Sequence, residues 1–193
     1  MMPNSRTPSL LIAPEVLNAA VSILDDEGLD GFTVRAIAKR ANVAPMAIYN
    51  HFGGVNGVIE ELWNRGFEML RIAITRHSGD VEGDFLSAGL AYRRFALENR
   101  GLYRIMFLQT FRNFEPSPAS AQVAARTFQA LVAIVERCQA AGLFVHSRPS
   151  DAAQVVWASC HGYVSLDMHS VNFASDADDA YLMLLETLRR GLR

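Results

Sequence analysis

Residues 33 to 52 read TVRAIAKRANVAPMAIYNHF, and this stretch decides the fold of the first part of the chain. Its first half carries four apolar residues at the spacing of one helix face: Val34, Ile37, Ala38 and Ala41. Thr33 stands directly before them, at a position where a hydroxyl side chain caps a helix. Residues 42 to 44 then turn the chain into a second short helix over 45 to 51, with Ile48 and Phe52 facing inward. Two short helices joined by a three-residue turn form a helix-turn-helix unit.

One more helix is predicted before this unit. Residues 1 to 13 show no helical period, and we expect a disordered arm there. From Pro14 onward, apolar residues take the helical spacing: Leu17, Ala20, Val21 and Leu24. Proline suits the first turn of this helix, and Gly28 suits its end. Residues 1 to 54 therefore predict an arm followed by a three-helix domain.

The rest of the chain, residues 55 to 193, predicts a larger helical domain. Gly53 and Gly54 interrupt the pattern, and a long helix over 55 to 77 then connects the two domains. Further helices are expected near residues 82–99, 101–112, 119–141, 150–170 and 176–191. No strand pattern competes with them. The predicted fold class is all-α.

Composition restricts the class of protein. Half of the 193 residues are hydrophobic, yet no run of 18 uncharged apolar residues could span a bilayer. This excess predicts burial between subunits or around a ligand. Prolines interrupt the only candidate signal peptide, so we expect a cytoplasmic protein. Cys138 and Cys160 are expected to be buried thiols rather than a disulfide or a metal pair. The net charge of −2 requires any contact with nucleic acid to be local to a small module.

The segment from Thr33 to Val58 resembles the DNA-binding signature of the TetR regulators, in which Thr, Ile-Ala, Ala-x-Val and Tyr-x-His-Phe stand in register. A second segment, WASCHG at residues 157 to 162, resembles the Trp-His-Gly type of TetR C-terminal domain, with NRGLYRIMF at 99 to 107 upstream. The resemblance implies a bacterial repressor that binds a palindromic operator as a homodimer and is released by a small, largely apolar inducer. It assigns DNA binding to residues 1 to 54, regulation and dimerisation to residues 55 to 193, and no cofactor. Such a protein is cytoplasmic and lies at the nucleoid when bound to DNA.

Three positions depart from the family pattern. The turn residue, usually Gly, is Asn42, the non-glycine residue that best tolerates a positive φ. The usual capping Ser is Ala44, which forfeits about 1 kcal/mol of capping energy, although Pro45 presets φ for the first turn. Val55 stands where the family commonly has a phosphate-binding Lys, so one backbone contact is expected to be missing.

The resemblance also assigns DNA contacts. Phosphate contacts, which position such a module, fall to Thr33, Tyr49 and His51, with electrostatic help from Lys39 and Arg40. Base contacts, which specify sequence, fall to Arg35, Pro45, Met46, Ala47 and Asn50. Arg35 and Asn50 carry most of the expected discrimination, because Arg pairs with guanine edges and Asn with adenine edges. An ordinary solvated helix face is the alternative for Lys39, Arg40 and the base-reading residues, and packing against Phe52 is the alternative for Tyr49.

The C-terminal domain is expected to hold a ligand pocket and a dimer interface. Family members bind inducers in an apolar interior with a few polar groups. The candidate pocket residues are Trp63, Phe67, Tyr103, Met106, Phe107, Phe128, Trp157, Cys160 and His161. The candidate dimer residues, on the last two helices, are Val155, Ser159, Gly162, Leu166, Leu184 and Leu188. A filled core is the alternative reading for the pocket residues.

An enzyme is not expected, since no phosphate loop, GxSxG elbow or HExxH motif occurs. Cys160 and His161 are adjacent on a helix, so their side chains diverge by about 100° and cannot act as a nucleophile and its base. No metal site is expected either. The alternative function is a helical ligand-binding or protein-interaction dimer with little specific DNA binding, which the acidic charge and Val55 permit.

Overall fold

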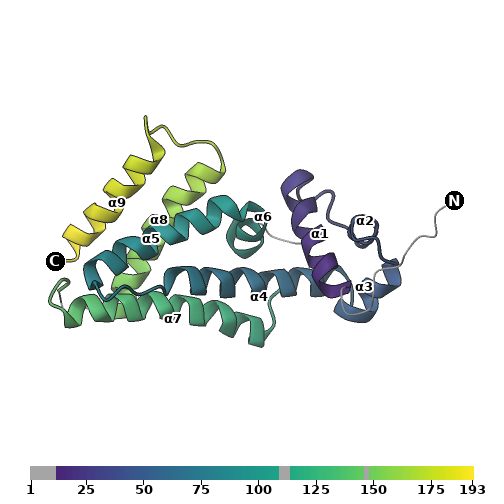
Figure 1. Ribbon diagram of the computed structural model, residues 1–193, viewed down its shortest axis with the longest axis horizontal. Helices are drawn as coiled ribbons and strands as arrows, with labels where there is room; N and C mark the ends of the chain where they lie inside the picture. Colours follow the sequence, from purple (N-terminus) through teal and green to yellow (C-terminus); the bar gives the residue numbers. More distant parts are fainter. Residues whose placement is uncertain (1–11, 109–113, 146–147) are drawn as a thin grey trace. The chain divides into compact units, whose positions relative to one another are not determined.

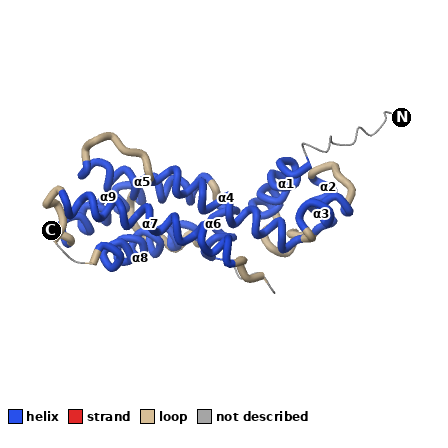
Figure 2. Tube along the Cα trace, turned by 90° about the horizontal axis from the view of Figure 1, so that it is seen from below, coloured by secondary structure: helices blue, strands red, loops and turns tan. Residues whose placement is uncertain are grey.

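The structure is a computed structural model that describes residues 12–108, 114–145 and 148–193. Within these ranges the chain forms helices and no strands (Figures 1 and 2), which confirms the all-helical prediction. The predicted arm, residues 1 to 13, falls mostly outside the described residues.

The three predicted N-terminal helices are present: α1 (Ile12–Asp26), α2 (Val34–Arg40) and α3 (Pro45–Phe52). The predicted inner face of α1 is confirmed at Ala20 and Leu24, which are buried, but not at its other two residues. Val16 and Ile23 are fully buried, whereas the predicted Leu17 and Val21 are only half-buried. Apolar residues occupy both neighbouring faces of this helix, and its packing against α2, α3 and α6 decides which one is buried.

The remaining helices follow the predicted order: α4 (Val55–Ile74), α5 (Val81–Glu98), α6 (Arg100–Tyr103), α7 (Pro118–Ala140), α8 (Pro149–Met168) and α9 (Ala177–Gly191). The helix predicted over 101 to 112 is the exception. After the short α6, the segment η2 (Arg104–Leu108) is a π-helix, and residues 109 to 113 lie outside the described ranges. Spacing by 3.6 residues does not indicate a π-helix, because its i to i+5 hydrogen bonds follow a different period.

The chain divides into two compact units, Met1–Gly66 with Arg100–Ser120, and Phe67–Asn99 with Ala121–Arg193. The division falls inside α4, whereas the sequence predicts a domain boundary after residue 54. The first turns of α4 and the segment α6 pack with the N-terminal helices. The Arg65 guanidinium donates to Asn18 Oδ1 at 3.3 Å, and a Cβ added at Gly101 would lie only 2.9 Å from Asp25 Oδ1 on α1.

Each unit has its own apolar core. In the first unit the fully buried side chains include Val16, Ile23, Leu24, Ile37, Ile48, Ile59, Leu62 and Tyr103. In the second unit they include Ile134, Val135, Ala153, Val164, Tyr181 and Leu185. Within the described residues, no helix combines the length and apolar character that crossing a lipid bilayer requires.

Candidate nucleic-acid interface and ligand cavity

The turn between α2 and α3 is held by local hydrogen bonds. Thr33 caps α2, because its Oγ1 accepts from the Ala36 backbone N–H at 3.1 Å. Asn42 has a φ of 54°, which confirms the left-handed conformation predicted for this position. The next N–H, that of Val43, donates back to the Ala38 carbonyl at 3.0 Å and closes the end of α2. The two helices are therefore joined by a tight, fully specified turn.

Helix α3 begins and ends as its sequence predicts. Ala44 stands at the N-cap without a side-chain hydrogen bond, and Pro45 occupies the first turn. At the other end, Gly53 has a φ of 72°, and its N–H donates to the Tyr49 carbonyl at 2.9 Å. Ile48 is fully buried and anchors the inner side of the helix. The opposite side of α3 is thereby left facing solvent.

The predicted DNA-contact residues lie on α2, on α3 or directly before α2. Met46 is 64% exposed and Tyr49 is 52% exposed, high values for large apolar or aromatic side chains. The other exposed members are Thr33, Arg35, Lys39, Pro45, Asn50 and His51, while Ala47 is half-buried. This exposed surface is called the α2–α3 surface below. Its large exposed apolar groups are typical of a surface that binds a partner.

Arg40, which was predicted to add electrostatic attraction for phosphate, pairs with acidic side chains of the same chain. Its guanidinium pairs with Asp26 at 2.6 Å and with Glu27 at 2.6 Å, and it donates to Ser22 Oγ at 2.8 Å. All three partners lie on α1 or directly after it. These contacts tie α2 to α1. Lys39, its exposed neighbour, has no ion-pair partner among the described residues.

The predicted pocket residues are divided between the two units. Trp63, Tyr103, Met106 and Phe107 belong to the first unit, and Phe67, Phe128, Trp157, Cys160 and His161 belong to the second. The contacts within each unit are described separately below.

In the first unit, the π-helix η2 and its neighbours carry an aromatic cluster. Tyr103 is fully buried, and its ring lies 5.0 Å from that of Phe107. The rings of Trp63 and Phe114 lie 6.2 Å apart. Met106 packs so closely on α4 that a Cβ at Gly66 would lie 2.5 Å from its sulfur. Phe114 was missed in the sequence because no helical spacing connects it to the other residues.

In the second unit, Trp157 stands between two other rings. The ring centroids of Phe128 and His161 each lie 6.0 Å from that of Trp157. His161 Nδ1 lies 3.1 Å from the Tyr92 hydroxyl, and burial lowers the pKa of His161 below its ordinary value, which favours the neutral imidazole. Burial likewise raises the pKa of the Cys160 thiol, so this cysteine is not an activated nucleophile.

A small cavity of about 30 Å³ lies beside Trp157 and Cys160. It is lined by Ile74, Phe85, Ala88, Gly89, Tyr92, Leu131, Val156, Trp157, Cys160 and Leu185. This volume holds about one water molecule, whereas small-molecule sites measure about 300 to 1,000 Å³. Most of its lining was missed in the sequence. The signal was available on α5, where Phe85, Ala88 and Tyr92 recur at helical spacing.

Helix α8 is buried on one side and exposed on the other. Cys160 and Val164 face the core, while Val155 is 53% exposed and Leu166 is 48% exposed. The other candidate dimer residues are Gly162, which is exposed, and Ser159, Leu184 and Leu188, which are half-buried. On α9, the sequence prediction missed Leu182 and Met183, which are 42% and 68% exposed. An apolar surface on α8 and α9, called the α8–α9 face, is thus left without cover in the single chain.

Comparison with known proteins identifies the family. A family model described as bacterial regulatory proteins, tetR family, matches residues 16–62. A second, described as the tetracyclin repressor-like C-terminal domain, matches residues 85–188, more than half of the 193 residues. The chain belongs to the TetR family of transcriptional regulators. Membership in a family of regulators agrees with the prediction that it is not an enzyme.

Individual relatives agree with this TetR-family assignment. An uncharacterized HTH-type transcriptional regulator of Bacillus subtilis is 36% identical over 98 residues, which are 49% of this chain and 50% of that protein. A solved structure of a protein with unknown function from Rhodococcus sp. RHA1 is 25% identical, with a TM-score of 0.84 over 100% of this chain and 99% of that chain. A TetR variant from Acinetobacter baumannii, solved in complex with minocycline, is 22% identical and has a TM-score of 0.63. The aligned region covers 91% of this chain and 93% of that chain. At that identity the last likeness concerns the fold.

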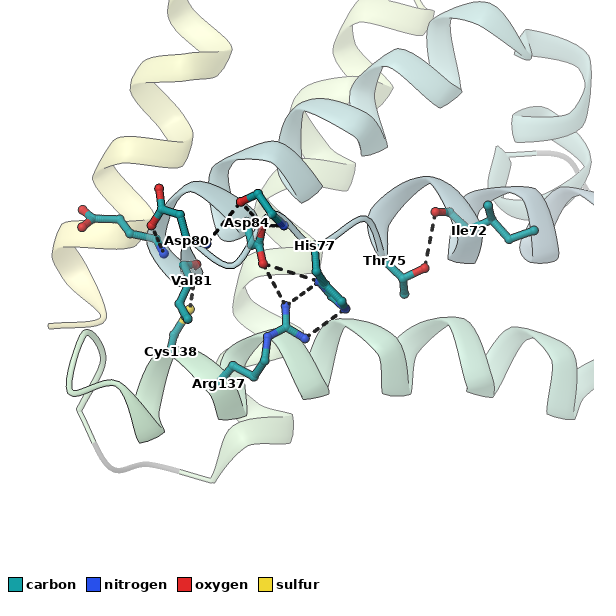
Figure 3. A network of polar contacts seen from close by, with 10 residues as sticks. Ile72, Thr75, His77, Asp80, Val81, Asp84, Arg137 and Cys138 are labelled. Carbon is teal, nitrogen blue, oxygen red and sulfur yellow. Dashed lines mark hydrogen bonds and ion pairs between the residues drawn. The ribbon is translucent and has the colours of Figure 1, made fainter.

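In this TetR-family chain, a polar network holds the segment between α4 and α5 (Figure 3). Asp84 is buried, and its Oδ1 accepts from the N–H and the hydroxyl of Ser78 at 2.7 and 2.8 Å. These hydrogen bonds lower the pKa of Asp84 below its ordinary value. Arg137, on α7, reaches toward Asp84 at 3.8 Å and contacts His77 Nδ1 at 3.0 Å. The network therefore links α5 and the segment after α4 to α7.

A second polar contact joins α5 to the last two helices. The Arg93 guanidinium pairs with Asp167 on α8 at 2.7 Å and with Asp178 on α9 at 2.6 Å. It also lies 5.4 Å from the ring centroid of Tyr181, within range of a cation–π contact. Only 12% of the Arg93 side chain and 8% of the Asp167 side chain are exposed. The ion pairs of Arg93 therefore join α5 to α8 and α9, the two helices that carry the α8–α9 face.

Proposed function

We propose that this regulator is a repressor that binds a palindromic DNA operator as a homodimer, and that a small, largely apolar inducer releases it. The observation that carries the proposal is the α2–α3 surface, which presents Met46 and Tyr49 to solvent on a helix anchored by the buried Ile48. Residues 1 to 54 are proposed as the DNA-binding domain and 55 to 193 as the regulatory and dimerisation domain. The proposed location is the cytoplasm, at the nucleoid when the protein is bound to DNA.

The proposed homodimer rests on the α8–α9 face. Exposed Val155 and Leu166 on α8, together with Met183 on α9, are apolar side chains that a second copy would remove from water. Gly162 lies on the same helix with nothing within 4 Å of the position of a Cβ, so a partner helix has room to approach closely. A twofold pairing through this face brings two recognition helices to one DNA duplex. The operator is then an inverted repeat with half-sites about 34 to 36 Å apart.

The proposed inducer site is the interior around Phe128, Trp157 and His161. The cavity of about 30 Å³ is too small for an inducer, so binding requires a second conformation with a larger pocket. That conformation releases DNA if it separates the recognition helices. Helix α4 is the proposed lever, because it runs from the end of the helix-turn-helix to the wall of the cavity at Ile74. A solved TetR variant holds minocycline, which supports a small molecule as the class of effector.

A gel-shift titration against the intergenic DNA beside the gene tests the DNA-binding proposal. The control is a fragment of equal length and base composition with a scrambled sequence. We expect saturable retention of the intergenic fragment at concentrations that leave the control free, and a symmetric footprint on it. Equal retention of both fragments contradicts the proposal.

One observation favours a second candidate, a helical ligand-binding or protein-interaction dimer with little specific DNA binding. Arg40 pairs with acidic groups of the same chain, and Val55 carries no charge where the family pattern has Lys, so two positions of the module offer less positive charge to phosphate. Equal retention in the gel shift, together with an unchanged dimer in light scattering, supports this second candidate.

Calorimetry tests the inducer proposal. Coupling between two binding sites is reciprocal, and typical coupling free energies are about 1 to 3 kcal/mol. If the inducer weakens operator binding by a given factor, saturating operator must therefore weaken inducer binding by the same factor. Trp157→Ala is expected to change inducer affinity more than it changes operator affinity in the absence of inducer. Identical inducer affinities with and without operator contradict the proposal.

A further inference from the structure

A groove of about 320 Å³ runs between the second half of α4 and α5, wholly within the second unit. It is lined by Met69, Ala73, Ile74 and Arg76 from α4 and the residues after it, and by Ser87, Ala88, Ala91, Arg94, Phe95, Glu98 and Asn99 from α5 and its C-cap. This volume is about ten times that of the interior cavity and lies at the lower end of the range for small-molecule sites.

Part of the groove lining is apolar, and small residues make it hollow. Ala73, Ala88 and Ala91 project only a methyl group each, so the two helices leave space between them. Two large apolar side chains on neighbouring positions of the same helices are also exposed. Ile72 is 52% exposed and Leu90 is 41% exposed. Ile72 and Leu90 do not line the groove, whose own apolar part is formed by Met69, Ile74, Phe95 and the alanines.

The charged residues of the groove are unevenly balanced. Arg76 and Arg94 are both exposed, and within the described ranges neither has a hydrogen-bond or ion-pair partner. Glu98 lies one helical turn after Arg94, so a carboxylate also lines the Arg94 end of the groove. Among the lining residues Glu98 is the only acidic one, and no carboxylate of the lining lies one helical turn from Arg76. The end of the groove at Arg76 therefore carries an uncompensated positive charge in a chain whose net charge is −2.

From this arrangement we propose that the α4–α5 groove binds a small amphipathic anion, with its anionic group on Arg76 and its apolar body over Ala73 and Ala91. A guanidinium suits a carboxylate because the two form paired, charge-assisted hydrogen bonds. The lining residues of α5 span about 18 Å of helix, enough for a chain of eight carbons. The site differs from the proposed inducer interior, although Ile74 and Ala88 line both spaces.

Titration calorimetry with octanoate tests the proposal, and octanamide serves as the uncharged probe of equal length. The protein is used alone, without DNA, so the result does not depend on its role as a repressor. We expect one octanoate site per chain and about tenfold weaker binding of octanamide. Arg76→Gln should weaken octanoate binding about tenfold and leave octanamide binding unchanged. The matched control is Arg148→Gln, because Arg148 is an exposed arginine whose partner, Asp151, lies outside the groove.

Ala91→Trp is the second variant, since the indole is expected to fill the groove from a half-buried position without entering the core. It should abolish octanoate binding while circular dichroism and light scattering remain those of the unmodified protein. Three results overturn the proposal: no octanoate binding at millimolar concentration, equal loss in Arg148→Gln and Arg76→Gln, or binding that survives Ala91→Trp. A change of oligomeric state in Ala91→Trp also overturns it, because the groove is then an interface between copies of the chain.

Discussion

Removing the Arg93 side chain is expected to destabilise the second unit strongly. Arg93 Nε lies 2.7 Å from Asp167 Oδ2, and both side chains are almost buried, at 12% and 8% exposure. Breaking a buried pair by removing one partner costs about 3 to 5 kcal/mol, because the other charge remains buried without compensation. Asp167 keeps one hydrogen bond, from the Asn172 amide at 2.5 Å, so Arg93→Met is expected near the lower end, about 3 kcal/mol.

The matched control is Asp178→Asn, which removes the other carboxylate bound by the same guanidinium. Asp178 is 86% exposed, and an exposed ion pair contributes about 0 to 1 kcal/mol. Urea unfolding followed by circular dichroism measures both values, at one fixed protein concentration because the proposed dimer would be stabilised by mass action. The double variant Arg93→Met with Asp167→Asn should be more stable than Arg93→Met alone, since it leaves no unpaired buried charge. Equal losses in Arg93→Met and Asp178→Asn, or no recovery in the double variant, refute this reasoning.

Three other predictions concern different parts of the molecule. Hydrogen bonds from Ser78 lower the pKa of Asp84 in the folded protein. The ionised carboxylate therefore adds stability that is complete above the unfolded pKa of about 3.9 and is lost as the pH falls through the lower folded pKa. The free energy of unfolding of Asp84→Asn, measured across pH 2 to 7, should differ from that of the unmodified protein near neutrality and converge with it in acid. On operator DNA, Arg35→Ala should cost about 1 to 3 kcal/mol and relax preference at one base pair per half-site, whereas Tyr49→Phe should weaken all sequences alike; equal relaxation in binding assays on operator variants argues against this division of roles. Leu166→Arg places a charge on the α8–α9 face, and light scattering should report monomer or aggregate in place of the expected dimer; a wild-type monomer at micromolar concentration contradicts the interface itself.

Local features of the helix-turn-helix were predictable because they depend on neighbours in the sequence. The cap at Thr33, the positive φ of Asn42 and the proline in the first turn of α3 all follow from the conformational preferences of single residues. The order and approximate ends of the other helices follow from apolar spacing and from glycine and proline breaks. The motif in residues 33 to 58 was specific enough to indicate the family that the comparisons establish.

Side-chain partners were not predictable, because they come from segments far apart in the chain. Lys39 and Arg40 are adjacent and chemically alike, yet only Arg40 meets Asp26 and Glu27 across the helix pair. Arg93 gives no signal in the sequence of its pairing with Asp167, 74 residues later. The predicted pocket residues share an apolar character, but the structure divides them between the two units and leaves only a small cavity at Trp157.

The sequence by itself therefore determined the helical class, the helix-turn-helix and its turn, since hydrophobic period and backbone preference act over a few residues. Tertiary packing settled three features: which face of α1 is buried, that Arg40 pairs with Asp26, and where space is left between α4 and α5. The physical reason is that burial, ion pairing and cavities depend on the distance between side chains on different helices, and no local pattern encodes that distance.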